Sequence, residues 1–113
     1  MSLKERLLSK KVLEETIVVD GETFVAVGKG RDVVSAVFAE CRNKKGVLNT
    51  VKAENKLLAL VIHDEHRQPV MDEHEWGRVV PHIARPLVAC MSRVCGLDDT
   101  DLADPKDSDS TQS

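Results

Sequence analysis

The sequence predicts a small α+β domain in which an N-terminal β-hairpin is followed by three to four helices. Its 113 residues are enough for one domain but not for two. Asp20-Gly21 separates two runs rich in β-branched residues, which is a strong short-range sign of a hairpin. Beyond the hairpin, apolar residues recur at the spacing of amphipathic helices. We therefore expect a single domain over residues 1–97.

The first predicted elements are a short helix and the hairpin. Ser2-Leu3-Lys4-Glu5 has the form of a capping box, and the helix that it opens is expected to end near Lys11, with its three leucines on one face. The strands of the hairpin are expected at residues 16–19 and 23–27.

Two amphipathic stretches follow the hairpin. Residues 33–41 carry a helical stripe of apolar side chains, and Gly46 stands where a C-terminal stop is expected. Residues 50–62 form a second helical stretch, although the apolar run 57–62 fits a strand as well as a helix. The polar segment 63–69 is expected to be a loop or turn.

The last helical region begins after Asp72, which forms a capping signature with Glu75. Its apolar face is interrupted by Pro81 and Pro86, because each proline removes a backbone donor and crowds the preceding turn. Either one helix is kinked, or a short helix ends before Pro81 and another begins there. Gly96, with an apolar residue after it, is typical of a Schellman stop.

Residues 98–113 differ in composition from the rest of the chain. They hold six Asp and one Lys, with very few large apolar side chains. Burial of such a segment cannot offset the entropy lost on ordering it. We therefore expect a disordered acidic tail after the domain.

Composition also excludes several classes of function. Three cysteines make no disulfide framework, and the longest apolar run, 57–62, is far shorter than the roughly 20 residues of a membrane span. One Trp, two Phe and no Tyr cannot build a stacking platform for single-stranded nucleic acid. The net charge of −3 opposes binding to nucleic acid or to anionic membranes. We expect a cytosolic protein with neither partner.

A histidine-rich segment offers the most tempting chemistry. All four histidines and five carboxylates lie between His63 and His82, and imidazole with carboxylate suits zinc and similar ions. The spacing matches no metal motif, however, and a polar turn followed by an acidic helix start explains the same residues. His63, His66 and His74 are therefore weak candidates for metal ligands. We expect no catalytic residue and no cofactor, and the residues favour a non-enzymatic binding or assembly module.

Three passages, taken in order, carry a resemblance to a known family. A hairpin of the form VVDGETFVAVG leads into an amphipathic helix. Next comes LLALVIHDEHRQPVMDEHEW, in which an apolar helix is followed by D-E-x-x-x-P-[VL]-[MF], an acidic residue and W. The third passage is VVPHIARPLVACMSRVCGLDD, with a mid-helix P-L and a terminal Gly-Leu. Over roughly residues 16–99 the chain resembles the tail assembly chaperones of long-tailed bacteriophages.

The resemblance implies a function and its partners. Proteins of this family bind the tape measure protein, a very long helical protein that sets tail length. They keep it soluble in the host bacterial cytoplasm until tail-tube subunits polymerise around it. Many also occur in a longer, frameshifted form, which would bring in the tail-tube protein as a further partner. The acidic tail would then mark the end of the short form.

A chaperone for a long amphipathic helix needs apolar grooves that self-association repeats along its client. We therefore expect a homo-oligomer. We hypothesise that the last helical region supplies most of the contact with the client or with other subunits, through Trp76, Val80, Ile83, Leu87 and Met91. Core packing is the alternative for Trp76, although tryptophan is also enriched at interfaces. Two other functions remain open: a metal-binding or regulatory interaction protein that uses residues 63–75, and a host-interaction protein that uses its acidic tail.

Overall fold

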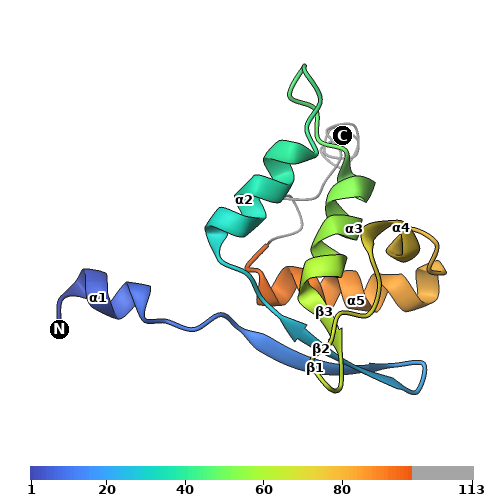
Figure 1. Cartoon of the computed structure of the whole chain (residues 1–113), viewed down its shortest axis with the longest axis horizontal. Helices are drawn as coiled ribbons and strands as arrows, with labels where there is room; N and C mark the ends of the chain where they lie inside the picture. Colours follow the sequence, from blue (N-terminus) through green and yellow to red (C-terminus); the bar gives the residue numbers. More distant parts are fainter. Residues whose placement is uncertain (98–113) are drawn as a thin grey trace, which may run out of the picture.

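The computed structural model describes residues 1–97, and it confirms the α+β class (Figure 1). Four helices follow the hairpin within these residues, and one short helix precedes it. The predicted acidic tail, 98–113, lies outside the described residues. In chain order the elements are α1 (Leu3–Leu8), β1 (Glu14–Val19), β2 (Glu22–Val27), α2 (Arg31–Glu40), α3 (Thr50–Val61), β3 (Ile62–Asp64), α4 (Glu73–Trp76) and α5 (Pro81–Val94).

The hairpin forms as predicted. Asp20 and Gly21 have φ angles of 53° and 80°, so both residues of the turn are left-handed, as a type I′ turn requires. Strands β1 and β2 pair antiparallel from Val19↔Glu22 to Glu14↔Val27. The Asp-Gly pair thereby sets the register of the whole hairpin.

A third strand was not predicted. The segment 63–69 was expected to be a loop or turn, but His63 and Asp64 belong to β3, which pairs antiparallel with β2. Only the turn at residues 65–67 matches that expectation. The apolar run 57–62 is helical through Val61, and its last residue, Ile62, opens the strand. The sheet order is β1-β2-β3.

The prolines divide the last region into two helices. Helix α4 begins with a complete capping box between Asp72 and Glu75, and α5 starts with Pro81 in its first turn, where the missing N–H costs nothing. Pro86 lies inside α5. The helix closes as a Schellman motif: Gly96 has φ +69°, and the N–H of Leu97 donates to the carbonyl of Ser92 at 2.8 Å.

Two helix ends differ from the prediction. Helix α1 ends at Leu8 rather than near Lys11. Helix α2 ends at Glu40, and Gly46, with φ +81°, lies in the following loop rather than at the helix stop. In that loop the backbone carbonyl of Asn43 accepts a hydrogen bond from the Gly46 N–H. The side-chain oxygen of Asn43 accepts from the backbone N–H groups of Lys45 and Val47. This local turn chemistry, not the helix, requires the glycine.

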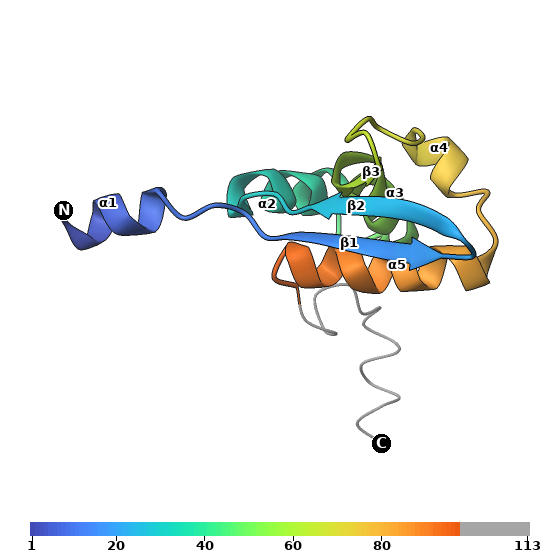
Figure 2. The same ribbon diagram turned by 90° about the horizontal axis from the view of Figure 1, so that it is seen from below.

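The core is aliphatic and lies between the sheet, α3 and α5. Figure 2 shows α5 running along the hairpin strands. The largest fully buried side chains include Leu57, Leu58, Ile62 and Leu87. Just after β2, the backbone at Gly28 passes so close to α5 that a Cβ there would collide with the backbone carbonyl of Val94. In residues 1–97 no helix is both long enough and apolar enough to cross a membrane.

Candidate partner-binding groove

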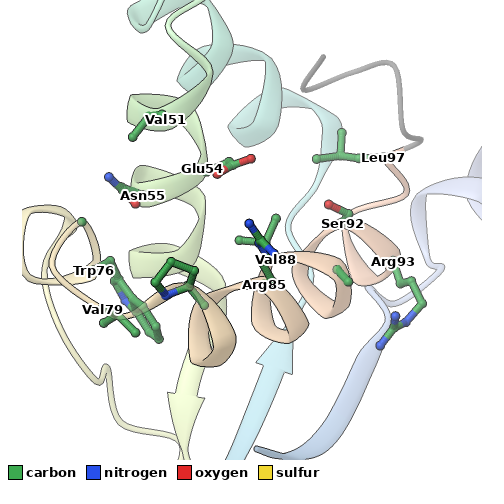
Figure 3. A pocket seen from close by; sticks show the side chains of 14 residues that line it. Val51, Glu54, Asn55, Trp76, Val79, Arg85, Val88, Ser92, Arg93 and Leu97 are labelled. Carbon is green, nitrogen blue, oxygen red and sulfur yellow. The ribbon is translucent and has the colours of Figure 1, made fainter. Parts of the chain in front are cut away.

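An open groove lies between α3 and α5, with a volume of about 870 Å³ (Figure 3). Helix α5 contributes Pro81, Ala84 and Val88, which recur at the three- and four-residue spacing of one helical face, and Ala89 beside them. Val51 of α3 and Val79, which precedes α5, add further apolar surface. The neighbouring face of α5, with Leu87, Cys90, Met91 and Val94, packs in the core. The helix is therefore apolar on two sides, and only one of them is covered.

The groove contains one carboxylate that no cation of the described residues neutralises. Glu54 of α3 is partly buried beside the groove, and within residues 1–97 it has no hydrogen bond or ion pair. Burial raises its pKa, because the charged form loses hydration without gaining a partner. Arg85 of α5 is exposed at the same groove and likewise pairs with no acidic group in the described part of the chain.

Two other charged side chains of α3 and α5 do have partners. Arg93 forms two hydrogen bonds to the Glu15 carboxylate, of 2.7 and 3.1 Å, which join α5 to β1. These bonds lower the pKa of Glu15. Lys56 of α3 joins Glu40 at 3.2 Å and Glu73 at 3.3 Å, so that it links α2, α3 and α4. Glu54 differs from these groups in having no partner among residues 1–97.

The residues predicted to contact a partner divide between core and surface. Trp76 is 2 % exposed, and Leu87 and Met91 are 0 % exposed, so none of these three offers a surface to another protein. Ile83 is half-buried, and Val80, before the first turn of α5, is half-exposed. In the monomer these three residues pack in the core, Leu87 and Met91 from α5 and Trp76 from α4. Contact with a partner through Val80 and Ile83 stays a prediction.

Trp76 nevertheless reaches the groove. Its ring lines one end (Figure 3), while its Nε1–H is buried and has no acceptor within the described residues. Because its side chain is 2 % exposed, the indole contributes packing at this end of the groove rather than a hydrogen bond. Trp76 is both part of the core and adjacent to the groove, so its sequence position alone could not distinguish core packing from contact with a partner.

The three candidate metal ligands do not converge. The Nδ1 of His63 lies 2.8 Å from the carbonyl oxygen of Val61, His66 is exposed in the turn, and His74 is exposed on α4. Within residues 1–97 no three His, Cys, Asp or Glu side chains are placed to hold a metal ion. The segment folds as a turn around Asp64, whose carboxylate accepts from the backbone N–H groups of His66 and Gln68. These bonds lower the pKa of Asp64.

The sequence does contain a pattern that indicates the groove, but its residues are less hydrophobic than those of the core stripe. Ala84, Val88 and Ala89 form a second, less hydrophobic stripe on α5, next to the stripe that fills the core. Small residues let another backbone approach closely, so the groove can take a helical or extended segment with apolar side chains. No family model, curated protein or solved structure matches this chain.

Proposed function

We propose that this protein is a non-enzymatic assembly chaperone of long-tailed bacteriophages. It binds the tape measure protein in the host bacterial cytoplasm and keeps it soluble until tail-tube subunits polymerise around it. The observation that carries the proposal is the open groove between α3 and α5, whose lining includes a row of alanine and valine side chains. The resemblance over residues 16–99 supplies the identity of the client.

The groove has the form that an amphipathic helix requires. Such a helix places apolar side chains in a row at three- and four-residue intervals and inserts them into an apolar furrow. The small side chains of Ala84 and Ala89 admit its backbone, while Val51 and Val88 contact its apolar row. Burial of these contacts supplies the binding energy without any covalent chemistry.

The size of the groove explains why several copies are needed for each client. Helix α5 has 14 residues and is therefore about 21 Å long. One copy covers about four turns of a client helix, which is a small part of a very long protein. Several copies bound along one client shield its apolar row together, and their combined effect exceeds that of any single site.

The test is co-expression with the tape measure protein of the same genome, followed by affinity capture and sizing. We expect a soluble complex that holds several copies of this protein per client. Ala89→Glu places a charge in the groove and should reduce the captured client at least tenfold, because that charge must be desolvated on binding. Ala36→Glu makes the same change at an exposed alanine of α2, outside the groove, and should leave capture unchanged.

Two results would contradict the proposal. One is a client that stays insoluble while the wild-type protein elutes alone. The other is equal capture by the Ala89→Glu and Ala36→Glu variants, which would place client binding elsewhere on the surface. Unfolding measurements on both variants establish that the comparison is made between folded proteins.

A further inference from the structure

The N-terminal arm, residues 1–13, is a second apolar feature without a cover. Figures 1 and 2 show α1 projecting away from the domain. Its leucines, Leu3, Leu7 and Leu8, are 63 %, 61 % and 77 % exposed, and none of its residues is buried. A six-residue helix is well below the length of about 12–15 residues at which isolated helices become even marginally stable. The arm therefore needs a surface that its own domain does not supply in this structure.

The apolar face of α1 carries one positive charge. At about 100° per residue, Leu3, Leu7 and Leu8 share a face, and Lys4 falls between Leu7 and Leu8 on it. The α3–α5 groove combines apolar side chains with two charged groups that have no partner within residues 1–97, the partly buried carboxylate of Glu54 and the exposed guanidinium of Arg85. An ammonium group brought to Glu54 neutralises the partly buried one of these two charges.

We propose that α1 of one copy lies in the α3–α5 groove of a second copy, with Lys4 paired to Glu54 of that second copy. Arm and groove are different surfaces, so the contact is head-to-tail and extends into a ring or an open chain. Helix α1 already extends away from the rest of its own domain (Figure 1).

The acidic segment 98–113 is a poorer match for the same groove. Its six Asp repeat the charge of Glu54 instead of neutralising it, and Leu102 is its one large aliphatic residue. The arm offers three leucines together with a lysine. Self-association through the arm goes beyond client binding, because it fills the groove when no client is present.

The test is sedimentation equilibrium of the full chain, whose monomer mass is 12.5 kDa, in the absence of any client. We expect a mass above that of the monomer that rises with concentration. Lys4→Glu and Glu54→Lys should each weaken self-association at least tenfold, because each places like charges together in the contact. The double variant restores opposite charges and should recover most of the association. Leu7→Asp should abolish it.

Matched controls make the same charge changes outside arm and groove. Lys44→Glu, in the loop after α2, and Glu65→Lys, in the turn after β3, are both exposed and should leave the mass unchanged. If Glu54→Lys impairs folding, Lys4→Glu still tests the contact, because Lys4 touches no part of its own domain's core.

Three results would overturn the inference. The wild-type chain could be a monomer at every concentration. Leu7→Asp could leave the mass unchanged, which would place any self-association elsewhere. A monomer whose α1 amides are protected from hydrogen exchange would show the arm bound to its own domain. Since no client is present in these experiments, none of these results bears on the proposed chaperone function.

Discussion

Replacing Leu87 by alanine tests whether its side of α5 serves the stability of the fold, while the groove side serves binding. Leu87 is 0 % exposed and belongs to the core, so its truncation leaves a cavity among atoms that can relax only partly. Such substitutions cost about 2–5 kcal/mol, against a total stability of about 5–15 kcal/mol for most domains. At about 4–8 °C per kcal/mol, a loss of about 3 kcal/mol lowers the melting temperature by about 12–24 °C.

The chain carries its own probe for this measurement. Trp76 is the only tryptophan, it is 2 % exposed, and there is no tyrosine, so its emission reports directly on exposure of the core. Urea titrations of Leu87→Ala and Ala89→Glu, followed by this emission, give the two free energies of unfolding. Ala89 is exposed in the groove, so its substitution should change stability by no more than about 0.5 kcal/mol.

The reasoning fails if Leu87→Ala loses less than about 1 kcal/mol, because a fully buried leucine cannot be truncated so cheaply. It fails equally if that variant keeps its stability but no longer captures client. In either case the stripe of Trp76, Leu87 and Met91 would be the contact face after all, and the groove would not be. A stable Ala89→Glu variant that captures client poorly is the complementary expected result.

Two further predictions concern stability. Gly28→Ala drives a Cβ into the Val94 carbonyl and should lower the free energy of unfolding by about 1–3 kcal/mol. In Gly30→Ala the new Cβ meets only the movable Asp32 carboxylate at 2.9 Å, so the loss should be less than about 1 kcal/mol. Urea titration of the two variants compares these losses. The raised pKa of Glu54 means that the folded state binds the carboxyl proton more tightly than the unfolded chain does. The charged carboxylate therefore destabilises the folded state at pH values above the folded pKa, and this destabilisation disappears well below pH 4.5. In dilute solution, where monomer dominates, Glu54→Gln should therefore raise the urea midpoint of unfolding at neutral pH and leave it unchanged in strong acid. A higher midpoint in acid, or a lower midpoint at neutral pH, would contradict this prediction.

Elements encoded by neighbouring residues were predictable. Asp20-Gly21 requires left-handed backbone at both turn positions, and Gly96 supplies the left-handed residue of the Schellman motif. Asp72 caps α4, and Pro81 begins α5 for reasons confined to a single turn of chain. In each case a few adjacent residues decide the conformation, and no distant contact overrides them.

Features that depend on distant contacts were not predictable in the same way. Strand β3 has only three residues, and it exists because Ile62 meets Ala26 of a strand formed much earlier in the chain. Similarly, the pattern of α5 shows which residues are apolar but not which of its two apolar sides the sheet will cover. The more hydrophobic side, with Leu87 and Met91, packs in the core, and α5 lines the groove with alanine and valine.

Arm and client helix compete for one groove if both proposals hold, and that competition has a measurable consequence. A ligand's apparent affinity falls in proportion to the fraction of sites that are free, so grooves filled about nine-tenths of the time weaken client binding about tenfold. Leu7→Asp empties the groove without altering its lining, because Leu7 lies on α1 and contributes nothing to the groove of its own domain. A peptide from the client should therefore bind this variant more tightly than wild type in a fluorescence titration. Equal affinities at concentrations where the wild type is associated would mean that arm and client occupy different surfaces.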